Sequence, residues 1–154
     1  MFQFCKNSKI QGDVGLSCAI QYFSVCGYTV SIPLTDSQDY DLVVEIQSIL
    51  YKVQVKTVTH KAPSGYYRVS LRTCGGNSKG TYIKYGTDII YDLLFVLTDE
   101  GDCYLIPKKE IINHKAGVTL GKDKDCYKVF TVTQNFNKIE LMNNDKFSSM
   151  SGHQ

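Results

Sequence analysis

Residues 40–57 read YDLVVEIQSILYKVQVKT. Apolar and polar side chains alternate along both ends of this stretch, which is typical of two half-buried β-strands. Residues 41–46 form the first predicted strand and residues 50–57 the second. Because only a short polar break at Gln47 and Ser48 separates them, the stretch predicts an antiparallel β-hairpin, although its turn contains no glycine.

The expected register of this hairpin brings polar side chains together. With two turn residues, Asp41 lies opposite Gln54, and opposed side chains on one face have Cβ atoms roughly 5 Å apart. Lys56 lies on the same face, one step further along the second strand. A shift of one residue would move one set of side chains to the other face. The register therefore predicts a cluster of one carboxylate, one amide and one ammonium group.

These groups suit metal-assisted hydrolysis of a phosphodiester bond. Mg²⁺ favours oxygen ligands, which the Asp41 carboxylate, the Gln54 amide and the backbone carbonyl of Val55 supply. Such a metal polarises the phosphate and activates a water molecule, and Lys56 would stabilise the charge that develops. Spacing alone leaves the alternative open that these residues are only the solvated face of an amphipathic edge hairpin.

The segment before the hairpin predicts a helix over residues 11–26. Its apolar residues recur at helical spacing, and Gly27 is a natural C-terminal stop. Ser8 is the expected N-cap, and Asp13 is expected in or near the first turn, where a negative charge suits the helix dipole. This helix precedes segments that are mostly strand-like.

The remaining pattern predicts an α+β fold with a mixed central β-sheet flanked by helices. The largely apolar run at residues 92–98 indicates a buried strand, and the glycine-rich residues 74–80 predict a flexible loop. Further strands are expected at residues 28–32, 66–73, 103–106 and 127–132, and a short helix or turn at residues 108–114.

Length and composition are those of a single soluble domain. The chain has 154 residues, of which 43% are hydrophobic and 21% charged, so we expect one domain at residues 1–142 and a polar tail at residues 143–154. No apolar run has the length of a membrane span, and the start of the chain does not resemble a signal peptide. We therefore expect a cytoplasmic protein with no membrane partner, whose six cysteines are free thiols.

Binding to nucleic acid would have to come from local clusters of basic residues, because the net charge is only +2. A basic strand that leads into a glycine-rich loop suits phosphate contacts. An ordinary solvated strand face explains the same residues equally well. The candidate DNA contacts are Lys52, Lys61, Arg68, Arg72, Lys79 and Lys84.

The motifs of the hairpin resemble the PD-(D/E)xK nuclease superfamily. More narrowly, the chain is similar to the small endonucleases associated with group I introns, which use a Q-x-K variant of the motif. The similar segments include Gly12-Asp13-Val14-Gly15, Tyr40-Asp41-Leu42-Val43, Val53-Gln54-Val55-Lys56-Thr57 and Tyr91-Asp92-Leu93-Leu94.

The resemblance implies a restriction-endonuclease-like fold with a core like that of Holliday junction resolvases. It also implies a Mg²⁺-dependent DNA endonuclease of the homing or junction-resolving type, for which Mn²⁺ can replace Mg²⁺, assembled as a homodimer or homotetramer. Asp41, Gln54 and Lys56 carry over as the catalytic residues, and Asp41, Gln54 and Val55 as the metal-binding ones.

Leu16 is a departure from the family pattern. The family commonly places a glutamate on the first helix to complete the metal site, and Leu16 stands at the corresponding position. Asp13, one helical turn earlier, is the candidate replacement ligand. The alternative function is a DNA-binding module whose nuclease site is degenerate and weakly active or inactive.

Overall fold

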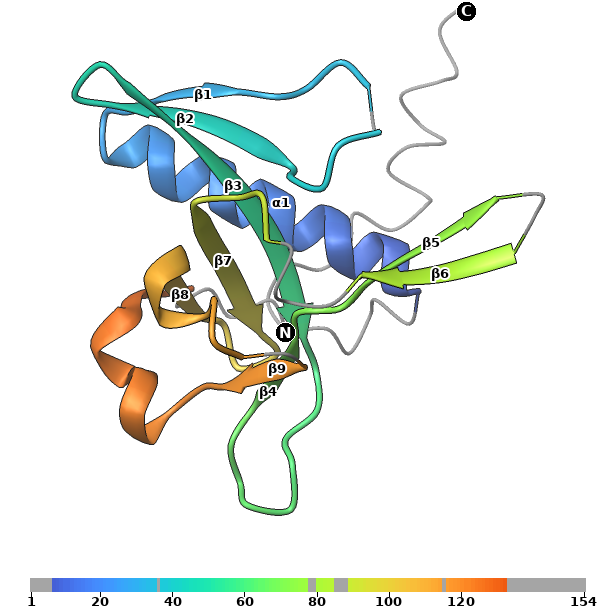
Figure 1. The fold of residues 1–154 in the computed structure, drawn as a ribbon. Coiled ribbons are helices and arrows are strands. Elements are labelled where there is room, and N and C mark those ends of the chain that lie inside the picture. The colour runs from blue at the N-terminus through green and yellow to red at the C-terminus, as the bar shows by residue number, and fades with distance from the viewer. Residues whose placement is uncertain (1–6, 36, 78–79, 85–88, 115, 133–154) are drawn as a thin grey trace, which may run out of the picture.

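The computed structural model describes residues 7–35, 37–77, 80–84, 89–114 and 116–132. Within these ranges, six strands form one mixed sheet in the order β1-β2-β3-β7-β8-β10, and helix α1 (Ser8–Val25) lies against one of its faces (Figure 1). The strands of this sheet are β1 (Thr29–Ser31), β2 (Leu42–Ile46), β3 (Ile49–Val58), β7 (Leu93–Thr98), β8 (Asp102–Pro107) and β10 (Lys128–Thr131). The expected α+β class and mixed sheet are confirmed.

Helix α1 begins three residues earlier than the apolar pattern predicts. Asn7, not Ser8, is the N-cap, and its side-chain oxygen accepts a hydrogen bond from the backbone N–H of Lys9 at 2.8 Å. Because the helix starts early, Asp13 lies beyond the first turn, and the expectation that it faces the positive end of the dipole is wrong. The stop at Gly27 is confirmed, with a positive φ of 79°.

The β2–β3 hairpin has the predicted register. Ile46 pairs with Ile49 and Leu42 with Val53, which leaves Gln47 and Ser48 as the two turn residues. Both have positive φ angles, 51° and 65°, as a tight hairpin turn requires. The right-handed twist of the strands therefore selects this backbone conformation even though the sequence supplies no glycine.

The central strand β7 pairs parallel with β3 and antiparallel with β8. Leu94, Phe95, Val96 and Leu97 are fully buried, as the apolar run predicts for a strand covered on both faces. Phe95 and Leu97 face α1, where they pack with Phe23. Each such side chain contributes roughly 1.5–3 kcal/mol by leaving water.

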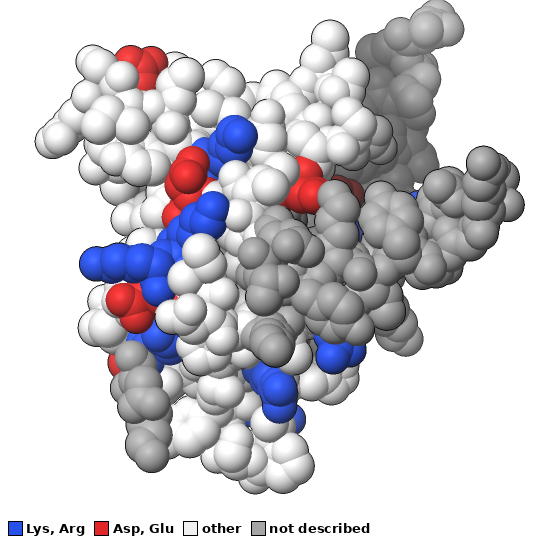
Figure 2. Space-filling model, in the orientation of Figure 1, with Lys and Arg blue, Asp and Glu red and all other residues white. Residues whose placement is uncertain are grey.

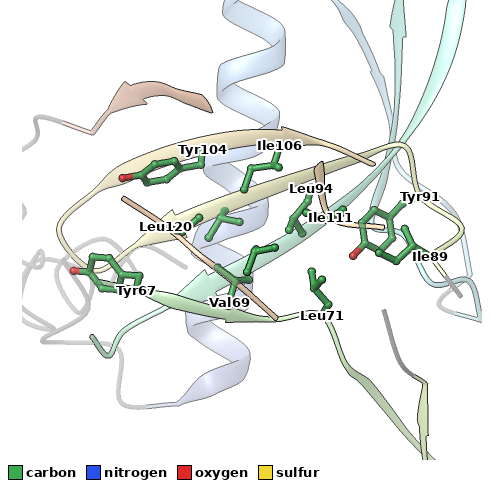
Figure 3. Close-up of a cluster of buried hydrophobic side chains, with 12 residues drawn as sticks. Tyr67, Val69, Leu71, Ile89, Tyr91, Leu94, Tyr104, Ile106, Ile111 and Leu120 are labelled. Carbon is green, nitrogen blue, oxygen red and sulfur yellow. The ribbon is translucent and has the colours of Figure 1, made fainter. Parts of the chain in front are cut away.

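The other face of β7 packs against a small second layer. Figure 3 shows this cluster, in which Leu94 and Ile106 of the sheet face Val69, Leu71 and Leu120. The second layer is formed by β4 (Arg68–Ser70) and β9 (Gly117–Thr119), which pair antiparallel. The sequence pattern did not predict β9, and the strand expected at residues 66–73 is confirmed only over the span of β4.

The prediction of a flexible loop at residues 74–80 is wrong. Strands β5 (Thr73–Asn77) and β6 (Gly80–Lys84) pair as a hairpin that projects away from the main sheet (Figure 1). A glycine-rich run is compatible with a loop or a hairpin, and strand pairing decides between them.

Short 3-10 helices complete the described fold, η3 (Lys108–Glu110) directly after β8 and η4 (Lys122–Tyr127) before β10. The expected short helix or turn at residues 108–114 is therefore confirmed. The predicted tail at residues 143–154 lies outside the described residues. Among the residues that the structure describes, no helix is long and apolar enough to span a membrane.

Candidate active site

The hairpin brings Asp41 and Gln54 into direct contact, as its register predicts. One carboxylate oxygen of Asp41, Oδ2, accepts a hydrogen bond from Gln54 Nε2 at 2.7 Å and from the backbone N–H of Val55 at 2.6 Å. The backbone N–H of Asp41 donates to the carbonyl of Val53 at 2.8 Å. Asp41 is thereby held by three hydrogen bonds to β3. Two are accepted by its carboxylate oxygen, and one is donated by its backbone N–H.

This arrangement arises because β2 is shorter than β3. The pairing of the two strands ends at Leu42 and Val53, so the next β3 residues have no partner on that side. The carboxylate of Asp41 takes the place of the missing strand and satisfies the N–H of Val55. An aspartate at this position therefore ends the ladder and satisfies the first backbone donor beyond it.

Lys56 follows on the same face of β3 as Gln54. Burial raises the pKa of the Asp41 carboxyl above its usual value, while the hydrogen bond from Val55 and the positive charge of Lys56 lower it. The net direction is upward because desolvation is the largest of these effects. Asp41 is thus a half-buried carboxylate whose negative charge is only partly compensated by protein groups.

The donor atoms around Asp41 fit a hard divalent cation. They are a carboxylate, the Gln54 amide and the carbonyl of Val55, which lies 3.3 Å from Gln54 Nε2. The under-compensated charge of Asp41 is itself an argument for a cation at this point. Gln54 now presents its nitrogen to Asp41, so its amide must rotate before its oxygen can act as a ligand.

A cation here would rest on few charged ligands. In the described part of the chain, no three His, Cys, Asp or Glu side chains come together as a metal-binding group. Mg²⁺ commonly binds through one or two carboxylates, with waters and substrate phosphates completing its shell. The residues present therefore fit Mg²⁺ better than a metal that requires a closed cage of protein ligands.

The structure does not join Asp13 to this cluster. Asp13 is exposed on α1 and borders a shallow depression with Ile10 and Ser17, which Asp41, Gln54 and Lys56 do not line. Leu16 is partly buried and packs on the apolar layer between α1 and the sheet. The role of Asp13 as a replacement ligand therefore stays a prediction.

Asp92 links the strands next to this cluster, a contact that the sequence pattern did not predict. Its Oδ2 accepts a hydrogen bond from the backbone N–H of Lys52 at 2.8 Å, and its own N–H donates to the carbonyl of Lys52 at 2.8 Å. Its carbonyl accepts from the N–H of Lys108 at 2.8 Å. Asp92 thus ties β3 to β7 and β8 two residues before Gln54. Its place directly before the buried run was the available signal.

Replacement of Asp92 by alanine should lower stability, because the N–H of Lys52 then loses its acceptor. The expected cost is about 1 kcal/mol of the free energy of unfolding, measured by urea denaturation. Asp92→Asn keeps an acceptor oxygen and should lie much closer to the wild type. Equal losses for the two variants would show that the carboxylate contributes through its charge rather than through this hydrogen bond.

The candidate DNA contacts are found in different surroundings. Lys61 forms an ion pair with Glu100 at 2.5 Å and lies over the ring of Tyr67, so its charge is already compensated. The ammonium of Lys52 lies 5.4 Å from the ring centre of Tyr40. Arg68 and Arg72 are exposed.

Two candidate DNA contacts remain, Lys84 and Lys79. Lys84 belongs to β6, and Lys79 lies outside the described residues. On the face drawn in Figure 2, the described basic residues (blue) and acidic residues (red) are interspersed and do not form one continuous basic surface.

Comparisons with known proteins agree with this geometry. A family model described as PD-(D/E)XK endonuclease matches residues 6–139. The solved structure of a bacterial homing endonuclease, I-Ssp6803I, is 26% identical, with a TM-score of 0.63, and the match covers 96% of this chain and 99% of that one. No curated protein matches the chain. Since the family model spans most of the sequence, this chain belongs to the PD-(D/E)XK endonuclease family.

Proposed function

We propose that this protein is a Mg²⁺-dependent DNA endonuclease, in which Mn²⁺ can replace Mg²⁺, with Asp41, Gln54 and Lys56 as its catalytic residues. The observation that supports this most directly is the contact between the Asp41 carboxylate, the Gln54 amide and the N–H of Val55, with the charge of Lys56 close by. A half-buried carboxylate next to a neutral amide and a lysine is suited to a cation and a phosphodiester.

Each residue has a distinct role in this proposal. The Asp41 carboxylate and the Val55 carbonyl would hold Mg²⁺, joined by the Gln54 oxygen once its amide has rotated. When bound, the ion supplies Lewis-acid polarisation of the phosphate and a more acidic water. The ammonium of Lys56 would donate to the phosphate oxygens and offset the charge that develops during attack.

Double-stranded DNA is the proposed substrate, and homing-type cleavage is favoured over junction resolution. The support is the similarity to a solved homing endonuclease over nearly the full length of both chains. One small active site cuts one strand, so a double-strand break requires at least two copies. A homodimer or homotetramer is therefore part of the proposal.

A DNA-binding module with a degenerate site is the second candidate. Leu16 packs on the apolar layer of α1, where the resemblance places a glutamate, and Asp13 is not joined to Asp41. With one carboxylate in place, metal affinity would be lower than in a site with two. This candidate expects DNA affinity without cleavage.

Metal-titrated cleavage of supercoiled plasmid separates the two candidates. We expect nicked and linear products in Mg²⁺ and Mn²⁺ and none in EDTA, because Asp41 alone cannot activate water. Four-way junctions run in parallel should be cut no faster than linear duplex of the same length. Tight binding with no cleavage in any metal would favour the DNA-binding module, and faster cutting of junctions would favour a resolvase.

A further inference from the structure

A groove lies next to Lys56, between the end of β3 and strand β4. It has a volume of about 320 Å³ and is lined by residues 56–60 and 68–70. A second depression of about 300 Å³ shares Arg68 and Ser70 with it and extends toward Arg72. Both depressions border Arg68 and Ser70, which are exposed on β4, so they lie next to each other on this side of the strand.

The charge of the groove favours an anion. Its lining contains three basic side chains, those of Lys56, His60 and Arg68, and no acidic one. Among the described residues, neither Lys56 nor Arg68 has an ion-pair partner, in contrast to Lys61, which pairs with Glu100. Unpaired cations that line one depression lower the energy of an anion placed there.

The edge of β3 adds a backbone donor. Pairing with β2 ends at Val53, and Asp41 accepts the next N–H on that edge, from Val55. Backbone groups on one edge of a strand recur every second residue, so the N–H of Thr57 is the next to point the same way. Backbone N–H groups commonly bind phosphate oxygens.

His60 is also placed to contact a ligand. Its Nδ1 lies 2.7 Å from the hydroxyl of Thr59, which leaves Nε2 as the ring nitrogen for another partner. On the opposite side of the groove, the hydroxyl oxygen of Ser70 accepts a hydrogen bond from the backbone N–H of Arg72 at 3.2 Å. This hydrogen bond helps to fix the backbone between Arg68 and Arg72 at the end of β4. The groove thus presents donors from both of its sides.

We propose that this groove binds the DNA backbone phosphate next to the scissile one on the strand that is cut. The inference rests on the proposed function, because it takes the scissile phosphate to lie between Asp41 and Lys56. Lys56 borders both places, so a backbone that reaches the groove is already aligned with the carboxylate. Arg68, the N–H of Thr57 and His60 would hold the flanking phosphate and fix the register of the cut.

The first test measures binding of a fluorescent 24-bp duplex in EDTA over a range of KCl concentrations. Arg68→Gln should weaken binding about 10-fold and reduce the slope of log K against log salt by about 1, the loss of one phosphate contact. Lys109→Gln, which removes an exposed lysine outside the groove, should leave the slope unchanged. An unchanged slope in Arg68→Gln overturns the inference whether or not the protein cuts DNA.

The second test locates the phosphate. Cut positions are mapped by sequencing nicked plasmid, and duplexes are then made with one uncharged methylphosphonate at each position around the cut. We expect kcat/KM of the wild type to fall about 10-fold when the methylphosphonate replaces the phosphate directly next to the cut on the same strand, the loss of a charged contact. In Arg68→Gln, the same methylphosphonate should cause less than about a 2-fold further loss.

The outcomes separate the inference from the proposed function. Independent, multiplicative losses from the mutation and from every methylphosphonate would overturn the groove as a phosphate site while leaving the nuclease intact. Absence of cleavage in every metal would instead count against the proposed function, and the salt slope would still decide whether the groove binds phosphate.

Discussion

Replacement of Asp41 by asparagine should abolish DNA cleavage and, at the same time, stabilise the protein. Cleavage should fall about 10³-fold or more, because the only charged candidate ligand in the hydrogen-bonded cluster is lost. Asparagine still offers an oxygen to the N–H of Val55, so the hairpin should remain folded. Single-turnover cleavage of plasmid DNA measures the first effect.

The gain in stability follows from the direction of the pKa shift. Burial raises the folded-state pKa of Asp41. A carboxyl of this kind favours folding below its unfolded pKa and loses that contribution as pH rises through its folded pKa. Ionised Asp41 therefore costs stability at neutral pH, and the uncharged amide avoids this cost. In EDTA, the Tm of Asp41→Asn should exceed that of the wild type at pH 7. The two Tm values should converge at about pH 4, where the Asp41 carboxyl becomes protonated in the unfolded chain as well.

The effect of Mg²⁺ on the Tm of the two proteins provides a second test of Asp41. Mg²⁺ should raise the Tm of the wild type, because an ion that binds only the folded state stabilises it, and should leave that of Asp41→Asn unchanged. Glu45→Gln is the matched control, since Glu45 is exposed on the same face of the same hairpin. An Asp41→Asn variant that still cuts DNA, or one that Mg²⁺ stabilises as strongly as the wild type, would remove Asp41 from the site.

Replacement of Lys56 by methionine should lower kcat by about 10²–10³-fold, the range found when one charge-stabilising donor is removed from an active site. Methionine preserves most of the volume of the side chain, so packing along β3 should be little changed. If Lys56 acts mainly in the transition state, kcat and kcat/KM should fall by similar factors, while KM changes little. Single-turnover and steady-state kinetics on one mapped duplex give both values.

Lys52→Met is the control for Lys56, because Lys52 lies on the same face of the same strand, two residues before Gln54. It should weaken DNA binding modestly with kcat near the wild-type value. Lys56→Arg should recover part of the lost activity, since it keeps the charge but not the shape of the ammonium group. Equal losses of kcat in the Lys52 and Lys56 variants would assign Lys56 to general DNA binding.

The central part of the candidate site could be predicted from the sequence because it depends on local geometry. Alternation along residues 41–46 and 50–57, with a two-residue turn at Gln47 and Ser48, leaves one register that buries the apolar sets. That register places Asp41 opposite Gln54, as the structure shows. The chain separation is only thirteen residues, so no distant contact is needed to bring the two side chains together.

The surroundings of the site could not be predicted in this way. Asp92 reaches the N–H of Lys52 from forty residues away, and Arg68 lines the same groove as Lys56 although the two belong to different sheets. Lys61 was a candidate DNA contact, and only the fold shows its pairing with Glu100. The β5–β6 hairpin was taken for a loop because glycines allow both structures.

The sequence by itself thus determined the hairpin, its register and the three polar groups on one of its faces. Side-chain alternation with a period of two and a two-residue turn are local properties that admit few alternatives. Only the tertiary structure decided which strand lies beside β3 and which basic residues line the groove next to Lys56. Those outcomes depend on how distant apolar faces are buried against one another, and many pairings of distant segments are compatible with the same local pattern.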